Sequence, residues 1–140
     1  MILRRAVVED MQRPEYMPLM RRVLARSNNG LVVDEDKVRA SVKNAILNGY
    51  AAVAEKDGVV GAYIGGITSE HAFYERLQLH VFGWYSELPG AGLKLFDMMM
   101  AWRDENPMIV AVYLYADPDA RLNRIMARRG AIVVPVYWFP

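Results

Sequence analysis

Hydrophobic and polar residues follow one another along the N-terminal third of the chain in a pattern that predicts one strand and two helices. Residues 2–8 predict a short strand, although Arg4 and Arg5 interrupt its alternation. Pro14 suits the first turn of a helix whose apolar residues recur at three- and four-residue spacing, and the Asn-Asn-Gly run at 28–30 ends it. A second amphipathic helix follows Asp34, which is a good N-cap, and ends at Asn48-Gly49.

The middle of the chain changes to the period of β-strands. Residues 50–55 and 59–68 are rich in strand-forming residues and flank Asp57-Gly58, a pair typical of a tight antiparallel hairpin. Residues 77–85 predict another strand. Two helices therefore precede a run of three strands.

The last third alternates helix and strand. Residues 90–104 predict a helix that Asn106-Pro107 closes, and residues 108–115 form a nearly continuous apolar run, which predicts a strand buried on both faces. A helix beginning at Asp117-Pro118-Asp119 should reach Arg129 and stop at Gly130. Residues 131–139 predict a final strand.

Composition narrows the class of protein. The 140 residues are 54% hydrophobic and 24% charged, which is typical of one soluble globular domain, and no linker or repeat divides it. A net charge of +1 gives no reason to expect nucleic acid or an anionic membrane as partner. The absence of cysteine excludes disulfides and thiol catalysis. With no leader-like or membrane-spanning run, we expect a cytoplasmic protein.

Candidate chemistry begins where the aromatic strand turns into the helix, in the segment WYSELPGAGLKLF. Backbone N–H groups in the first turn of a helix have no intrahelical partner, and the helix dipole adds positive charge, so small residues there allow a phosphate to approach. Gly90, Ala91 and Gly92 provide such a turn. The carboxylate of Glu87 would repel a phosphate unless it points away, and Lys94 would compensate in part. The alternative is that these small residues only let helix and sheet pack closely.

The order of elements, with the residues at their joints, resembles the GNAT superfamily of N-acetyltransferases. The resemblance covers nearly the whole chain and includes AAVAEKDGVVGAYIGG for the central hairpin, GWYSELPGAGLKLF for the acetyl-CoA loop and DARLNRIMARRGA for the final helix. The family loop reads Gln or Arg, two residues, Gly, one residue, then Gly or Ala. Gly90 and Gly92 match this pattern, and Glu87 departs from it.

This resemblance implies an α+β fold in three layers, with a mixed, mostly antiparallel sheet of about six strands and about four helices in a single domain over residues 1–140. It also implies acetyl-CoA as cosubstrate. The residues expected to bind it are Phe82, Gly83 and Trp84 on the strand, Glu87, Leu88, Gly90, Ala91 and Gly92 in the loop, and Lys94 in the helix. The strand residues would contact the pantetheine arm where the fourth and fifth strands separate. Gly83 independently indicates a bulge or a close backbone approach, or else a plain irregularity of the strand.

For catalysis, the resemblance implies direct attack of an amine on the thioester, with a base and an acid to move protons. His80 and Glu75 are the candidate bases, with Glu70 and His71 nearby, although a lone strand histidine is often structural. Met126 occupies the place of the family's tyrosine acid and cannot donate a proton, so the candidate acids are Tyr115, Tyr113 and solvent.

Two functions therefore stay open at this point. The first is an N-acyltransferase acting on a primary amine of a small molecule or a protein, and the second is a binding protein without catalysis, part of a larger assembly. The glycine loop favours the first, whereas Glu87 and Met126 favour the second, as does the aromatic cluster at residues 137–139 if it is exposed. The methionines at 98–100 indicate that their helix packs on more than one side, and a homodimer is one way to provide the second partner.

Overall fold

The computed structural model describes residues 1–25, 32–115 and 120–134. In these residues one sheet contains five strands in the order β1-β2-β3-β4-β5, with the first four antiparallel and β5 parallel to β4. The strands are β1 (Ile2–Arg5), β2 (Tyr50–Lys56), β3 (Val59–Glu70), β4 (Leu77–Ser86) and β5 (Ile109–Leu114). The helices are the short 3-10 helix η1 (Val8–Gln12) and the α-helices α1 (Tyr16–Ala25), α2 (Glu35–Asn48), α3 (Ala91–Asp104) and α4 (Ala120–Arg128).

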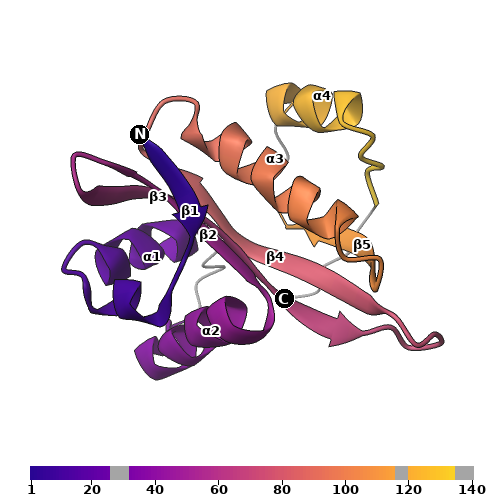
Figure 1. The fold of residues 1–140 in the computed structure, drawn as a ribbon, viewed down its shortest axis with the longest axis horizontal. Coiled ribbons are helices and arrows are strands. Elements are labelled where there is room, and N and C mark those ends of the chain that lie inside the picture. The colour runs from indigo at the N-terminus through magenta and orange to yellow at the C-terminus, as the bar shows by residue number, and fades with distance from the viewer. Residues whose placement is uncertain (26–31, 116–119, 135–140) are drawn as a thin grey trace.

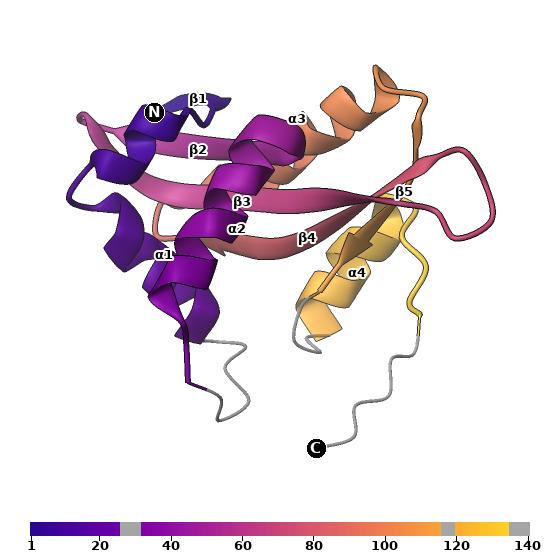
Figure 2. The same ribbon diagram turned by 90° about the horizontal axis from the view of Figure 1, so that it is seen from below.

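The elements form three layers, with the sheet in the middle (Figures 1 and 2). Helices α1 and α2 cover one face, where Tyr16, Leu19 and Met20 are buried against β2 and β3. Helix α3 covers the other face, and α4 packs beside α3. Met99 of α3 is buried in the core, and Met98 and Met100 are partly buried against it.

Local sequence signals account for several element boundaries, as predicted. The carboxylate of Asp34 accepts hydrogen bonds from the N–H groups of Asp36 and Lys37 and so caps α2. Asp57 (φ 53°) and Gly58 (φ 77°) both adopt left-handed backbone conformations between β2 and β3. This is the backbone of a two-residue hairpin turn, so the Asp-Gly prediction is confirmed.

The N-terminal segment departs from its predicted form. The predicted strand over residues 2–8 ends at Arg5, and residues 8–12 form the 3-10 helix η1. Asp10 explains the change, because its carboxylate accepts a hydrogen bond from the Val7 N–H (2.9 Å) and turns the chain out of the sheet. Helix α1 consequently begins at Tyr16, two residues after Pro14.

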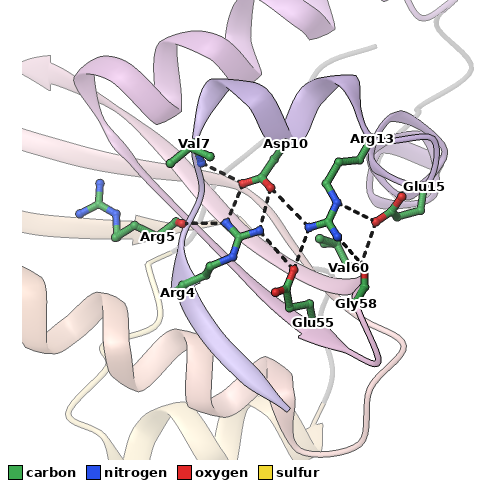
Figure 3. A network of polar contacts seen from close by, with 9 residues as sticks. All are labelled: Arg4, Arg5, Val7, Asp10, Arg13, Glu15, Glu55, Gly58 and Val60. Carbon is green, nitrogen blue, oxygen red and sulfur yellow. Dashed lines mark hydrogen bonds and ion pairs between the residues drawn. The ribbon is translucent and has the colours of Figure 1, made fainter.

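Asp10 also anchors a network of charges at this end of the sheet (Figure 3). The Arg4 guanidinium donates to both Asp10 carboxylate oxygens (2.8 and 2.7 Å) and to Glu55 (3.2 Å). Arg13 donates to Glu55 (2.7 Å) and to the Gly58 carbonyl, and it forms an ion pair with Glu15 (3.1 Å). Hydrogen bonds from Arg4 hold the pKa of Asp10 below its usual range, and those from Arg13 and Arg4 do the same for Glu55. The network ties β1, η1 and the β2–β3 hairpin together.

The C-terminal predictions need two corrections. Strand β5 is not buried on both faces, because Val110 and Tyr113 are 45% and 37% exposed and only Ile109 is buried. Helices α1 and α2 lie over the other end of the sheet and do not reach β5 (Figure 2). Residues 131–134, the described part of the predicted strand over 131–139, are not in a strand, and Ile132 is 86% exposed, so strand propensity alone did not suffice there. Residues 135–139, the aromatic cluster within them, and the predicted starts and stops at 28–30 and 117–119 lie outside the described residues.

Candidate functional site

The fourth strand contains a bulge, and beyond it no described strand pairs with one of its two edges. Gly66 pairs with Val81 and Gly65 with Gly83, so Phe82 is an extra residue in β4. The bulge predicted from Gly83 is therefore confirmed. On the other edge of β4, pairing with β5 runs only to Val81, and the last contact is the Tyr115 N–H to the Val81 carbonyl (3.4 Å). From Phe82 onward, no strand among the described residues pairs with that edge.

Glycine is required at the bulge because a buried tyrosine lies across it. A Cβ atom on Gly65 would come within 1.9 Å of the Tyr63 hydroxyl, and one on Gly83 within 2.8 Å of its ring. Tyr63 is 4% exposed, and burial raises the pKa of its hydroxyl. The ring fills the space between the sheet and α1, so the bulge has a rigid support on that side.

Helix α3 begins directly after the open edge, and its N-terminus is not capped. Gly90 is the N-cap residue with φ 75°, a conformation that glycine adopts without strain, and a Cβ there would meet nothing within 4 Å. The Ala91 N–H donates to the Leu88 carbonyl (3.1 Å). Within the described residues, no side chain caps the helix, and the N–H groups of Gly92 and Leu93 have no hydrogen-bond partner. Small residues, free donors and the helix dipole thus meet at one point.

The loop that leads into this helix is fixed to the sheet. The Glu87 N–H donates to the Gly61 carbonyl of β3 (2.8 Å), and the Leu88 side chain lies against the Gly61 backbone. The Ser86 hydroxyl accepts from the Leu88 N–H and donates to its carbonyl. Trp84 donates from Nε1 to the Gly92 carbonyl (2.9 Å). The helix N-terminus therefore has a defined position relative to the open edge of β4.

Glu87, the residue that departs from the family pattern, has its carboxylate paired with an arginine of α1. The Arg22 Nε lies 2.5 Å from Glu87 Oε1, and the Tyr85 hydroxyl donates to the same oxygen at 3.4 Å. Glu87 does not cap the free N–H groups of α3. An ion pair reduces the repulsion that this carboxylate would exert on a nearby anion. The position of Glu87 is therefore compatible with phosphate at the helix.

Four rings gather where β4 and β5 separate: those of His80, Phe82, Tyr113 and Tyr115. The ring centroids of His80 and Tyr113 lie 5.3 Å apart, with an interplanar angle of 13°. Those of Phe82 and Tyr115 lie 5.2 Å apart, with an interplanar angle of 10°. His80 is opposite Ile67 of β3, and Ile67 packs into the core under α1 and α2, so the cluster lies on that face of the sheet. Phe82 and Tyr115 are 54% and 50% exposed. The cluster is an accessible aromatic surface beside the open edge.

Both ring nitrogens of His80 are engaged. Nδ1 lies 2.9 Å from the Tyr115 hydroxyl, and Nε2 lies 3.0 Å from the hydroxyl of Ser69 on β3. The structure therefore brings together two of the predicted catalytic residues, His80 and Tyr115, and adds a third residue. Tyr115 sits one residue past β5, at the point where the two strands part.

The remaining predicted residues lie elsewhere. Glu75 is in the β3–β4 loop, where it lines a surface hollow with His71, Phe73, Tyr74, Arg76 and Val110. It makes no contact with His80 or Tyr115. Lys94 is in the first turn of α3, and its side chain has no ion pair among the described residues. Met126 is 7% exposed and packs in the core with α3.

Sequence reasoning missed Ser69 and Arg22. A serine near the end of a strand has no periodic signature, and only the pairing of β3 with β4 places it beside His80. For Arg22 there was an indirect signal, because a carboxylate in a candidate phosphate loop calls for a nearby cation. Nothing in the sequence distinguished Arg22 from Arg21 as that cation.

Two broader features limit the chemistry of the described residues. No three of their His, Asp or Glu side chains come together as metal ligands would. No helix among them is both long and apolar enough to cross a membrane.

Sequence comparison found neither a matching family model nor a matching curated protein. Solved structures with the same architecture were found at low identity. A ribosomal-protein-alanine N-acetyltransferase from Brucella melitensis has a TM-score of 0.73 and 14% identity, covering 99% of this chain and 96% of its own. An aminoglycoside acetyltransferase from a soil metagenome has a TM-score of 0.70 and 16% identity, and the match covers 99% of this chain and 94% of that one. The glucosamine-6-phosphate N-acetyltransferase of Arabidopsis thaliana has a TM-score of 0.68 and 14% identity, and the match covers 99% of this chain and 96% of that one.

These likenesses span nearly all of both chains, and the order of strands and helices agrees with the resemblance found in the sequence. The chain has the GNAT fold, the fold of the N-acetyltransferases named above.

Proposed function

We propose that the protein is an N-acetyltransferase that uses acetyl-CoA and transfers the acetyl group to a primary amine by direct attack on the thioester. The observation that carries the proposal is the uncapped N-terminus of α3 beside the open edge of β4. Among the described residues, the N–H groups of Gly92 and Leu93 have no hydrogen-bond partner and no side chain caps this helix start. This is the arrangement that binds phosphate in many folds.

The described residues fit acetyl-CoA in two respects. The start of α3 and the Lys94 ammonium offer positive charge to a diphosphate. The edge of β4 from Phe82 to Trp84, which no described strand pairs with, offers backbone groups to the amides of a pantetheine arm, as an exposed strand edge does for a peptide. When bound, acetyl-CoA supplies an activated acyl group and a thiolate leaving group.

His80 and Tyr115 are the residues best placed to handle protons in this reaction. They lie where β4 and β5 separate, on the face of the sheet that leads to α1 and α2. During transfer the amine nitrogen forms a bond to the carbonyl carbon, the carbon–sulfur bond breaks, and a proton leaves the nitrogen. Because Glu75 lies apart from His80 and Tyr115, we propose that these two residues act as the base.

For the acceptor we propose a primary amine on a small molecule or on a protein. The three similar structures are named for aminoglycosides, for glucosamine 6-phosphate and for an alanine of a ribosomal protein. These acceptors share an amine and little else. A GNAT-fold protein that binds without catalysis is the second candidate, and the burial of Met126 favours it, because that helix position offers no acid.

Binding of acetyl-CoA can be tested by thermal unfolding of the purified protein. A ligand present at one hundred times its Kd adds about 2.7 kcal/mol to the free energy of unfolding, which raises Tm clearly. Gly90→Glu places a carboxylate at the start of α3 and should abolish this rise in Tm. Gly58→Glu is the matched control, because Gly58 also has a positive φ (77°) and open space around its Cβ. It carries the same strain and charge and should keep the rise.

Three results are distinguishable. A rise in Tm that Gly90→Glu removes and Gly58→Glu keeps supports the site. A rise that both variants keep would place acetyl-CoA elsewhere on the protein. Acetyl-CoA binding without release of CoA, across a panel of amino sugars, polyamines and peptides with free N-termini, would favour the second candidate.

A further inference from the structure

We infer that Ser69, His80 and Tyr115 form a directed proton relay, in which His80 carries its proton on Nε2 and Tyr115 donates its hydroxyl hydrogen to Nδ1. This inference rests on the proposed function, because it assigns the direction of proton movement at the same site. It makes the pair a base for the incoming amine rather than an acid for the leaving thiolate. It also gives Ser69 a part as a positioning residue.

The relay is a line of three side chains from three neighbouring strands. Ser69 comes from β3, His80 from β4 and Tyr115 from the end of β5, and the two hydrogen bonds measure 3.0 and 2.9 Å. The imidazole stands between Tyr113 and Phe82 with its ring nearly parallel to both. Stacking on both sides and bonding at both nitrogens fix the ring, so its tautomer decides what Tyr115 can do.

Two directions are compatible with these distances. In one, Tyr115 donates to Nδ1 and the Nε2 hydrogen is donated to the Ser69 oxygen. In the other, Ser69 donates to Nε2 and the Nδ1 hydrogen is donated to the Tyr115 oxygen. A phenol is a stronger hydrogen-bond donor and a weaker acceptor than an alkyl hydroxyl, because its oxygen lone pair is delocalised into the ring. The first direction uses Tyr115 as donor and Ser69 as acceptor, and therefore gives the stronger pair of bonds.

The chosen direction leaves the Tyr115 oxygen free to accept a hydrogen bond on its outer side. An amine attacking the thioester can donate its N–H there. As the nitrogen–carbon bond forms and the carbon–sulfur bond breaks, that proton passes to the Tyr115 oxygen and the phenolic proton passes to His80 Nδ1. The charged imidazole then gives its Nε2 proton, through the exposed Ser69 hydroxyl, to water, and the thiolate takes a proton from water. This leaves the hydrogen on Nδ1, and the starting tautomer returns when Nε2 takes a proton from water through Ser69 and Nδ1 releases its own to water through the Tyr115 hydroxyl. Protons and charges balance over the cycle.

Nitrogen NMR of the imidazole tests the direction without any acceptor or acetyl-CoA. In uniformly labelled protein at about pH 8.5, where an ordinary imidazole is neutral, a protonated ring nitrogen and a bare one resonate far apart. The chain has only two histidines, so His71→Gln leaves the signals of His80 alone. We expect Nε2 to be the protonated nitrogen of His80. A protonated Nδ1 would overturn the inference.

Two substitutions test the part played by Ser69. Ser69→Ala removes the acceptor at Nε2 and should move the His80 signals towards averaged positions, the mark of two exchanging tautomers, whereas Ser69→Thr should restore the wild-type spectrum. Thr68→Ala is the matched control, because the neighbouring hydroxyl bonds to the Asn48 carbonyl instead. Unchanged His80 signals in Ser69→Ala would remove Ser69 from the relay. Because the Tm rise with acetyl-CoA is measured separately, failure of the relay and failure of the proposed function give different results.

Discussion

The two ends of the sheet treat their polar groups in opposite ways. At the β1–β2 end, Arg4, Asp10, Arg13 and Glu55 satisfy one another in a closed network, and Asp10 is 3% exposed. At the β4–β5 end, the edge of β4 beyond Val81 has no pairing strand among the described residues, and Phe82 and Tyr115 are about half exposed. At the first end the polar groups pair with one another and stabilise the fold, whereas at the second end backbone and ring groups are accessible to a ligand.

This difference shows how the fold can keep an open site without losing its shape. Strand β4, which carries the open edge, is joined to the closed end by its pairing with β3 and by the pairing of β3 with β2. A free strand edge alone is unstable or aggregation-prone, so it needs support from the rest of the sheet. The comparison therefore predicts that damage at the closed end lowers stability, whereas damage at the open end lowers ligand binding.

The largest effect is expected from Asp10→Ala. Removing the carboxylate leaves Arg4 without its main partner and the Val7 N–H without its acceptor. Breaking a buried pair costs 3–5 kcal/mol when both partners are enclosed, and because the Arg4 side chain is 30% exposed we expect about 2–3 kcal/mol here. Urea unfolding followed by circular dichroism measures this loss.

Glu9→Ala is the control for that variant. Glu9 lies in the same short helix and is exposed, and it makes no ion pair within the described part of the chain. Its loss should change the free energy of unfolding by less than about 0.5 kcal/mol. Equal losses for the two variants would mean that the charge network contributes nothing beyond the local helix.

Acid should weaken the closed end in a predictable direction. The arginines lower the pKa values of Asp10 and Glu55 in the folded protein, so the unfolded chain binds more protons at low pH. Their contribution to stability is complete above the pKa of the unfolded carboxyls and is lost as pH falls through the folded values. We expect the free energy of unfolding to fall as pH drops below about 5, and to fall less steeply in Asp10→Asn. Urea unfolding at a series of pH values checks this, and parallel curves for the two proteins would contradict it.

Much of the fold followed from local patterns. The Asp34 cap, the Asp57-Gly58 turn and the strand-to-helix turn at Gly90 are each set by residues adjacent in sequence, and each was predicted. The exposure of β5 was not, because it depends on how far α1 and α2 extend over the sheet. An apolar run reports strand propensity and says nothing about which neighbours cover it.

In the candidate site, too, the features set by residues close in sequence were predictable, and those set by contacts between strands and helices were not. Gly90 and Gly92 lie two residues apart in the sequence, so their placement at the start of a helix could be predicted. The contact of His80 with Ser69 and Tyr115 depends on the register of three strands, which a single sequence does not reveal. The pairing of Glu87 with Arg22 depends on how α1 docks over β4.

The smallest effect on stability is expected for the ion pair between Arg22 and Glu87. Arg22 and Glu87 are 46% and 42% exposed, so their ion pair contributes at most about 1 kcal/mol, and Arg22→Ala should hardly change stability. It releases a carboxylate beside the start of α3, however, and we expect the Kd for acetyl-CoA, measured by calorimetry, to rise about two- to fivefold. The change should shrink in high salt, because screening weakens repulsion between exposed charges.

Two further variants decide whether Glu87 is the cause. Adding Glu87→Gln to Arg22→Ala removes the released charge and should return the Kd to the wild-type value. Arg21→Ala breaks a comparable exposed pair on the same helix, with Glu35 at 2.8 Å, and should leave the Kd unchanged because that pair involves α2 and not the loop. If the double variant stayed as weak as Arg22→Ala, the arginine itself would contact the ligand. Glu87 would then serve to position Arg22, and the departure from the family pattern would be a feature of recognition rather than a cost that α1 offsets.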